Sequence, residues 1–102
     1  LLRQLVQRCD VVLNNFRPGV MDDMGLSWSA LQQIKPDIIS CHVTGFGLDG
    51  PYAQRPSFDF IAQAMSGFMS VNGFADGPPM RAAPPISDLI AGSYAAMGVL
   101  AA

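Results

Sequence analysis

The sequence predicts an α/β fold in which a parallel sheet forms part of a Rossmann-like layer. Segments with helical spacing of apolar residues alternate with two short runs rich in β-branched residues, at 10–15 and 37–46. Half of the 102 residues are hydrophobic and 14% are charged, against about 25% in an average soluble protein. So apolar a chain is expected to be part of a larger protein or to form an extensive interface between subunits.

The chain should begin with a helix over 1–9, whose apolar residues recur at helical spacing. The run DVVLNN at 10–15 then predicts a strand that ends in a loop. A short helix is expected to follow, because Pro18 suits a first helical turn and Gly25 suits the end of a helix.

A third helix is expected over 27–35, with Ser27 as its N-cap and Pro36 ending it. The run DIISCHVTGF at 37–46 predicts the second strand. Because this run is almost continuously apolar, we expect it to be buried on both faces, as strands of a parallel sheet usually are.

The second half should contain two further helices. A loop rich in Gly and Pro at 45–57 precedes a helix over 58–71, which Ser57 could cap. Residues 72–86 form a turn and then an extended stretch with several prolines. The last helix is expected from about Asp88 to the end of the chain.

Composition and charge exclude several classes of protein. The net charge is −2 and the six basic residues are scattered, so nucleic acid is a poor candidate partner. Cys9 and Cys41 lack metal-site spacing and are interpreted as reduced, buried thiols of a cytoplasmic protein. The apolar stretch 89–102 is shorter than the ~18 residues of a membrane span, so no membrane is expected.

The single histidine, His42, falls within the second predicted strand and is interpreted as a hydrogen-bonded core residue. A serine hydrolase is not supported, because no GxSxG motif is present. The remaining large apolar residues are also expected in the core: Trp28, Met21, Met24, Met65, Met69, Met80 and Met97.

Asp88 is a lone carboxylate in the apolar stretch PPISDLIAG at 84–92. One interpretation is structural, with Ser87 or Asp88 as the N-cap of the last helix. The other is chemical, because a helix N-terminus stabilises a carboxylate, and a carboxylate can attack an activated acyl group to form a covalent intermediate. Position alone leaves both interpretations open.

The hexapeptide NNFRPG at 14–19 follows the C-terminal end of a predicted strand, where ligands bind in open parallel sheets. Asn15 offers an amide, Phe16 a stacking face and Arg17 a charge suited to phosphate. Backbone N–H groups after Pro18 could meet an anion. The alternative is a turn with a surface arginine. Asp59, in RPSFDF at 55–60, fits a helix-start acid better than a base.

Four stretches together resemble the family III CoA-transferases, which include formyl-CoA and carnitine CoA-transferases and the related α-methylacyl-CoA racemases. They are DVVLNNFRPGVMDDMGL, PDIISCHVTGFGLDGPY, RPSFDFIAQAMSG and GPPMRAAPPISDLIAGSYAAMGVLAA, and they cover essentially the whole chain in order. The resemblance implies that residues 1–102 are part of a Rossmann-like large domain, truncated at both ends and without the small domain. It also implies a homodimer of two interlocked chains.

The resemblance also implies the chemistry. Asp88 matches the catalytic aspartate of the transferases, and Asp59 matches an acid near the reacting centre. Asn15 and Phe16 match residues that line the CoA site, and Arg17 lies in the same motif. CoA would move from an acyl-CoA donor to a carboxylic acid through an aspartyl intermediate, with CoA as a substrate and no metal or other cofactor.

Two departures from the family pattern bear on this interpretation. Asn14 stands where the motif usually has Glu. Phe58 stands where the racemase branch has a histidine, and without that imidazole a two-base racemisation lacks one proton carrier. A transferase is therefore preferred. The alternatives are an acyl-CoA racemase or epimerase and a non-catalytic CoA-binding module.

Overall fold

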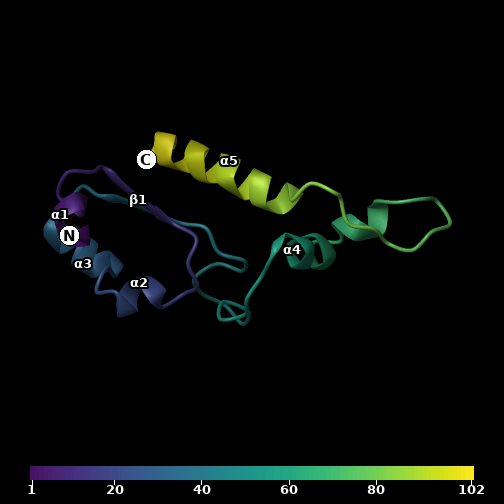
Figure 1. The fold of residues 1–102 in the computed structure, drawn as a ribbon, viewed down its shortest axis with the longest axis horizontal. Helices are drawn as coiled ribbons and strands as arrows, with labels where there is room; N and C mark the ends of the chain where they lie inside the picture. Colours follow the sequence, from purple (N-terminus) through teal and green to yellow (C-terminus); the bar gives the residue numbers. More distant parts are fainter.

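Two short strands form a parallel sheet in the computed structural model, which describes residues 1–102, and this sheet lies near α1 (Leu2–Val6) and α3 (Trp28–Ile34) (Figure 1). The strands are β1 (Val11–Asn14) and β2 (Ile39–His42). The register pairs Val11 with Ile39 and Asn14 with His42. Both predicted strands and their parallel pairing are thus confirmed, and the polar ends of the two strands lie side by side.

Five α-helices and one 3-10 helix surround this sheet or extend from it. Two helices lie between the strands in sequence, which gives the crossover that parallel pairing requires. The elements are α1 (Leu2–Val6), α2 (Val20–Asp23), α3 (Trp28–Ile34), α4 (Asp59–Met65), η1 (Phe68–Val71) and α5 (Ile86–Ala101). None of these helices is long and apolar enough to cross a membrane.

The apolar core lies in the first 40 residues, where α1, α2 and α3 pack beside the sheet (Figure 1). Leu31 is its most buried side chain. Cys9, Val12 and Ile34 pack partly against this core, which consists of Val6, Met21, Leu26, Leu31 and Ile38. α3 therefore faces the core through Leu31 and Ile34.

The molecule as a whole is open and elongated. Its radius of gyration is 16.9 Å and its extents are 56 × 27 × 22 Å, whereas a compact chain of 100 residues has a radius of about 13 Å. α5 runs along the other side of the sheet and has no buried residue (Figure 1). Much apolar surface is therefore exposed on this chain.

Several burial predictions are wrong for this reason. β2 is only half-buried, and Leu13 in β1 is 57% exposed, so the sheet is not covered on both faces. Met21 alone among the six methionines is buried, and Trp28 is 49% exposed. Cys9 and Cys41 are free thiols that are half-buried. These 102 residues contain too few elements to cover their own apolar side chains.

Two predicted helix caps have different outcomes. Ser27 Oγ accepts the Ala30 N–H at 3.2 Å, which confirms the cap of α3. Ser57 does not cap α4, because that helix begins at Asp59 and Phe58 occupies the N-cap position without a side-chain bond. The Ser57 hydroxyl instead donates to the Phe58 carbonyl at 3.4 Å. Ser57 thus stands one residue too early.

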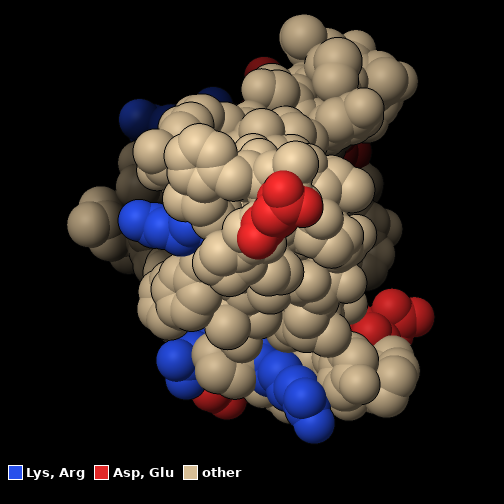
Figure 2. Space-filling view, turned by 90° about the vertical axis from the view of Figure 1, so that its right-hand side faces the viewer, with Lys and Arg blue, Asp and Glu red and all other residues tan.

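Charged side chains are sparse on the end of the molecule that faces the viewer in Figure 2. Lys, Arg and Asp side chains lie separately there among uncharged atoms. This agrees with the scattered basic residues of the sequence, and this face carries no basic stripe for nucleic acid.

Lys35 links the beginnings of the two strands. Its ammonium lies 3.0 Å from Asp10, which precedes β1, and 3.3 Å from Asp37, which precedes β2. Hydrogen bonds, first to Asp10 and then to Asp37, raise the pKa of Lys35 above its ordinary value. A raised pKa in the folded state means that folding favours the charged ammonium.

We expect Lys35→Met to lower the melting temperature at about pH 8, where the ion pairs are intact. The loss should be fully present below the unfolded lysine pKa of about 10.4 and should shrink as the pH rises through the raised folded pKa. Circular dichroism melts of wild type and variant in the complete protein measure the difference. Arg8→Met is the control, since Arg8 is exposed and forms no ion pair. An equal difference at about pH 8 and pH 11 contradicts the assignment.

Candidate functional site

A pocket of about 380 Å³ opens at the C-terminal ends of β1 and β2. It is built by the strand ends, the 16–19 turn, the junction of α2 and α3, and the 45–57 loop. Its lining includes Asn14, Phe16, Arg17, Asp22, Trp28, His42 and Gln54, so it carries one basic and one acidic side chain. The sequence placed a ligand site at this sheet edge, and the structure forms a pocket there.

Asn14 organises the rim of this pocket. Its Oδ1 accepts the Phe16 N–H at 3.2 Å, which closes a tight turn after β1. Since that N–H can only donate, the Asn14 Nδ2 must face His42, whose Nδ1 lies 3.1 Å away and accepts. His42 Nε2–H then donates to Ser40 Oγ at 2.9 Å. The hydrogen bonds thus fix one neutral tautomer of the imidazole.

His42 confirms its prediction only in part. It is hydrogen-bonded, as expected, but it is half-buried and does not belong to the apolar core. It also lines the pocket, which the sequence analysis missed. The available signal was the parallel pairing, because two strands of similar length place their last residues, Asn14 and His42, directly opposite each other.

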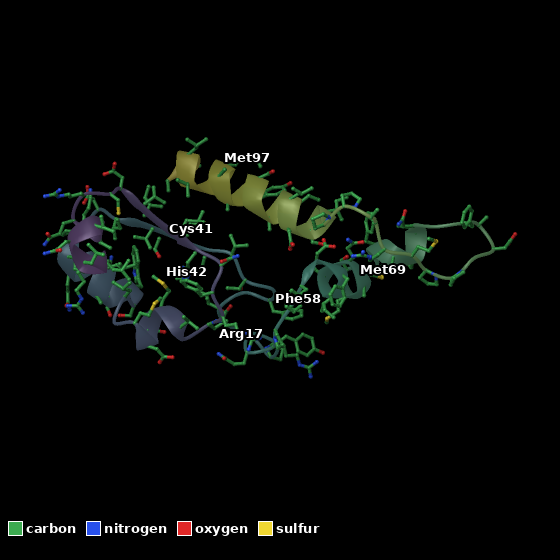
Figure 3. The ribbon with its side chains drawn as sticks, in the orientation of Figure 1. Arg17, Cys41, His42, Phe58, Met69 and Met97 are labelled. Atoms are coloured by element: carbon green, nitrogen blue, oxygen red, sulfur yellow. The ribbon has the colours of Figure 1, made fainter.

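The predicted ligand residues at 15–17 differ in their placement. Phe16 is 46% exposed, and both Phe16 and Arg17 line the pocket. Arg17 is exposed with no ion pair (Figure 3). Asn15 is exposed and does not contribute to the lining. The pocket therefore presents an aromatic face and a free guanidinium at one edge.

The turn after these residues corrects another expectation. α2 begins at Val20, two residues later than predicted, with Gly19 at the N-cap and a φ of 91° that favours glycine. The Val20 N–H donates to the Arg17 carbonyl at 3.2 Å. Because this amide is already bonded, Val20 is not among the residues whose N–H could meet an anion.

Asp88 lies at the other candidate centre, in the first turn of α5, and its side chain is exposed. Neither Ser87 nor Asp88 is the N-cap of this helix, contrary to the structural interpretation. The N-cap is Pro85, and no side chain of the helix caps it. α5 begins two residues earlier than expected because the Pro84–Pro85 pair leads directly into the first turn.

The first turn of α5 is capped from another helix. Asp59 Oδ1 accepts the Ser87 N–H at 2.8 Å, and Asp59 Oδ2 accepts from Gln63 Nε2 at 2.6 Å. Gln63 Oε1 in turn accepts the Ala82 N–H at 2.8 Å. Asp59 is indeed a helix-start acid, as predicted, but its bond to Ser87 spans 28 residues and was not expected.

Gln63 is not among the residues that the sequence pattern predicted to be functional. It is 1% exposed and, with Leu31, is one of the two most fully buried large side chains. The only signal in the sequence was its position four residues after Asp59, which places both side chains on one face of a helix. Asp59, Gln63 and Asp88 do not line the strand-end pocket, so the predicted site residues form two groups. No group of three His, Cys or Asp side chains is arranged to hold a metal ion.

Comparisons with known proteins agree with one another. The sequence model of a family described as CoA-transferase family III matches residues 1–102. A succinyl-CoA–D-citramalate CoA-transferase of Chloroflexus aurantiacus is 42% identical over 102 residues. A formyl-CoA:oxalate CoA-transferase of Streptomyces avermitilis is 43% identical over the same length. The whole chain is covered in both cases, but it spans only about a quarter (25%) of each relative.

Solved structures show the same relationship. A CAIB/BAIF family protein from Brucella suis superposes with a TM-score of 0.94 at 38% identity, over 98% of this chain and 26% of that one. A hypothetical protein from Mycobacterium tuberculosis gives a TM-score of 0.89 at 33% identity, over 99% of this chain and 29% of that one. The architecture described above is therefore that of one segment of these larger proteins.

We expect Asn14→Ala to destabilise the protein, because it leaves the Phe16 N–H and His42 Nδ1 without their partner. The free energy of unfolding should fall by about 1–3 kcal/mol, which is typical when one partner of a buried hydrogen bond is removed and the other is left unpaired. Urea unfolding of the complete protein measures this loss. Asn15→Ala is the matched control, since Asn15 is exposed and its side chain makes no hydrogen bond. Equal stability of the two variants contradicts the role given to Asn14.

Proposed function

Because the chain belongs to CoA-transferase family III, we propose that the protein carrying it moves CoA from an acyl-CoA donor to a carboxylic acid acceptor. The observation that carries the proposal is the match over all 102 residues to relatives that are named for such transfers. Asp88, exposed at the start of α5, supplies a nucleophile of the required type. The donor and the acceptor differ among these relatives.

In the proposed reaction the Asp88 carboxylate attacks the thioester carbonyl of the donor. The carbon–sulfur bond breaks, giving a mixed anhydride and CoA thiolate. The thiolate attacks the Asp88 carbonyl carbon and releases the donor as its carboxylate, which leaves an aspartyl-CoA thioester. The acceptor carboxylate then attacks the carbonyl carbon of the aspartyl-CoA thioester, which breaks its carbon–sulfur bond and gives a second mixed anhydride and CoA thiolate. The thiolate attacks the acceptor carbonyl of this anhydride, which forms the acceptor-CoA thioester and releases Asp88 as its carboxylate.

The position of Asp88 supports this role. It is the only charged residue of α5, and the positive end of the helix dipole stabilises a carboxylate in the first turn. The side chain is open to solvent on this chain, so a substrate can approach it. The small residues that follow, Ala91, Gly92 and Ser93, leave space for a ligand beside the helix.

The strand-end pocket supports CoA binding. The exposed ring of Phe16 can stack on an adenine base, and the unpaired guanidinium of Arg17 suits a phosphate. Asn15 adds an exposed amide beside them. In this proposal CoA is bound as a substrate at 15–17, and the residues described here need no metal or other cofactor for the transfer.

Phe58 favours transfer over racemisation. It stands directly before Asp59 and is 67% exposed, with its ring stacked on Phe60 at a centroid distance of 6.1 Å (Figure 3). A phenyl ring cannot carry a proton, so the two-base mechanism of a racemase lacks one of its groups at this position.

Because the chain belongs to CoA-transferase family III, we also propose that the complete protein is a homodimer.

We expect Asp88→Asn in the complete protein to abolish CoA transfer, by roughly 1,000-fold or more, because the attacking carboxylate is lost. Hydroxylamine added with acyl-CoA should trap the aspartyl thioester of the wild type, and mass spectrometry should locate the modification at Asp88. Asp76→Asn is the control, since Asp76 is an exposed acid in the 72–80 loop.

Retained transfer in Asp88→Asn would falsify the covalent role. Exchange of the substrate α-proton with deuterated solvent, without CoA transfer, would identify a racemase instead. CoA binding with neither reaction would indicate a binding module.

We expect Arg17→Gln to weaken CoA binding by roughly 10- to 100-fold, the value of a charge-assisted hydrogen bond to phosphate. Isothermal titration with CoA measures the dissociation constant, and the loss should be smaller at high salt because screening weakens the wild-type contact. Arg8→Gln removes another exposed arginine, from the turn after α1, and should leave binding unchanged. Equal affinities of the two variants argue against CoA at this pocket.

A further inference from the structure

We propose that Gln63 is a positioning residue for Asp88, acting through Asp59 as one buried hydrogen-bond clamp. The clamp consists of Asp59, Gln63 and the backbone amides of Ala82 and Ser87. It ties α4 to both ends of the segment 82–87, and Asp88 is the next residue. The inference rests on the proposed function of Asp88 and adds to it the device that holds the nucleophile in place.

Every polar atom of the two side chains in the clamp has a partner. Gln63 Nε2 donates to Asp59 Oδ2 at 2.6 Å, and Gln63 Oε1 accepts the Ala82 N–H at 2.8 Å. Asp59 Oδ1 accepts the Ser87 N–H at 2.8 Å. Asp59 is 7% exposed and Gln63 1% exposed, so water cannot replace these bonds at no cost.

The hydrogen-bond partners fix the orientation of the Gln63 side-chain amide. The Ala82 N–H can only donate, so it fixes the Gln63 oxygen on its side and turns the Gln63 amide N–H towards Asp59. The Ser87 N–H is likewise only a donor. Both carboxylate oxygens of Asp59 therefore accept hydrogen bonds.

The clamp supplies the only hydrogen bond between α4 and α5, from the Ser87 N–H to Asp59. α5 also packs against α4 and β2, but none of its residues is fully buried. The segment that the clamp holds is short and contains Pro84 and Pro85, which restrict the backbone. The Cα of Asp88 lies one peptide step, about 3.8 Å, beyond that of Ser87. A shift of Gln63 thus passes directly to the nucleophile.

This arrangement assigns Asp59 a different task from a proton carrier. Its two oxygens are occupied as acceptors, so it acts on the reaction through the position of Ser87 and Asp88. The clamp then requires the pattern of hydrogen-bond donors and acceptors, but not a negative charge at residue 59. Positioning and proton transfer by residue 59 therefore predict different results when the negative charge is moved to residue 63.

The test is a reciprocal exchange in the complete protein. In Asp59→Asn alone, at least one pair of N–H donors must face each other, whichever way the side-chain amides of residues 59 and 63 are turned. In Gln63→Glu alone, the carboxylates of residues 59 and 63 face each other at about pH 8. The double variant Asp59→Asn/Gln63→Glu restores the pattern. The amide N–H introduced at position 59 donates to the carboxylate introduced at position 63. That carboxylate still accepts the Ala82 N–H, and the amide oxygen at position 59 still accepts the Ser87 N–H.

Two readouts are taken on each variant. The first is the single-turnover rate at which an acyl-CoA modifies Asp88, measured by hydroxylamine trapping and mass spectrometry, with the dissociation constant for CoA measured alongside. The second is amide hydrogen exchange at Ala82 and Ser87. Gln33→Glu, exposed on α3, adds the same charge without touching the clamp and serves as the matched control.

We expect each single variant to slow modification of Asp88 by roughly 100-fold, since a displacement of about 1 Å has this effect at a reacting centre. CoA affinity should change less than about twofold, because the clamp does not line the CoA pocket. Exchange at Ala82 and Ser87 should become about tenfold faster when one hydrogen bond is lost. The double variant should recover both properties, and Gln33→Glu should match the wild type.

A double variant as slow as Asp59→Asn would show that the carboxylate itself is needed, and would overturn the positioning role. Wild-type rates in both single variants would overturn it as well. If the wild-type protein forms no adduct at Asp88, the proposed function fails by itself. Hydrogen exchange then still decides the clamp, since unchanged exchange in both single variants would refute it and recovery in the double variant would support it.

Discussion

One buried amide, the side chain of Gln63, holds the second half of this chain together. Residues 44–102 bury only one apolar side chain, Ala53, and their interior is instead the hydrogen-bonded pair of Asp59 and Gln63. Buried polar groups are costly unless each is bonded, so this interior allows few geometries. An apolar contact tolerates small slides, whereas these three bonds do not. These hydrogen bonds thereby restrict the position of the first turn of α5.

The first half is organised by a different force. Its five-residue core around Leu31 packs α1, α2 and α3 beside the sheet, and Lys35 links the approaches to both strands. Parallel pairing then sets Asn14 opposite His42. A slip of one residue would turn every strand side chain to the opposite face and separate this pair. The pocket at the strand ends therefore depends on the register as much as on its lining residues.

The two halves carry different parts of the proposed chemistry. The strand-end turn offers an aromatic ring and a free arginine for CoA, and the start of α5 offers the nucleophile. A transfer reaction needs both at a fixed separation, because the thioester must reach Asp88 while its CoA portion stays bound. α5 runs along the sheet (Figure 1), so the rigidity of the clamp and the register of the strands jointly set that separation. The exposed apolar surface of α5 surrounds the nucleophile with little competing charge.

The sequence by itself determined both strands, their parallel pairing, the Ser27 cap and the long final helix. Each depends on an apolar period or on a partner three residues away, which can be read along the chain. The four linked motifs also identified the family. Only the tertiary structure decided that the N-cap of α5 is Pro85 and not Ser87, that Asp59 accepts a backbone N–H of its first turn, and that Met65 and Met97 are exposed. These outcomes depend on partners 19 and 28 residues away or on how many elements cover a surface. Local patterns contain neither kind of information.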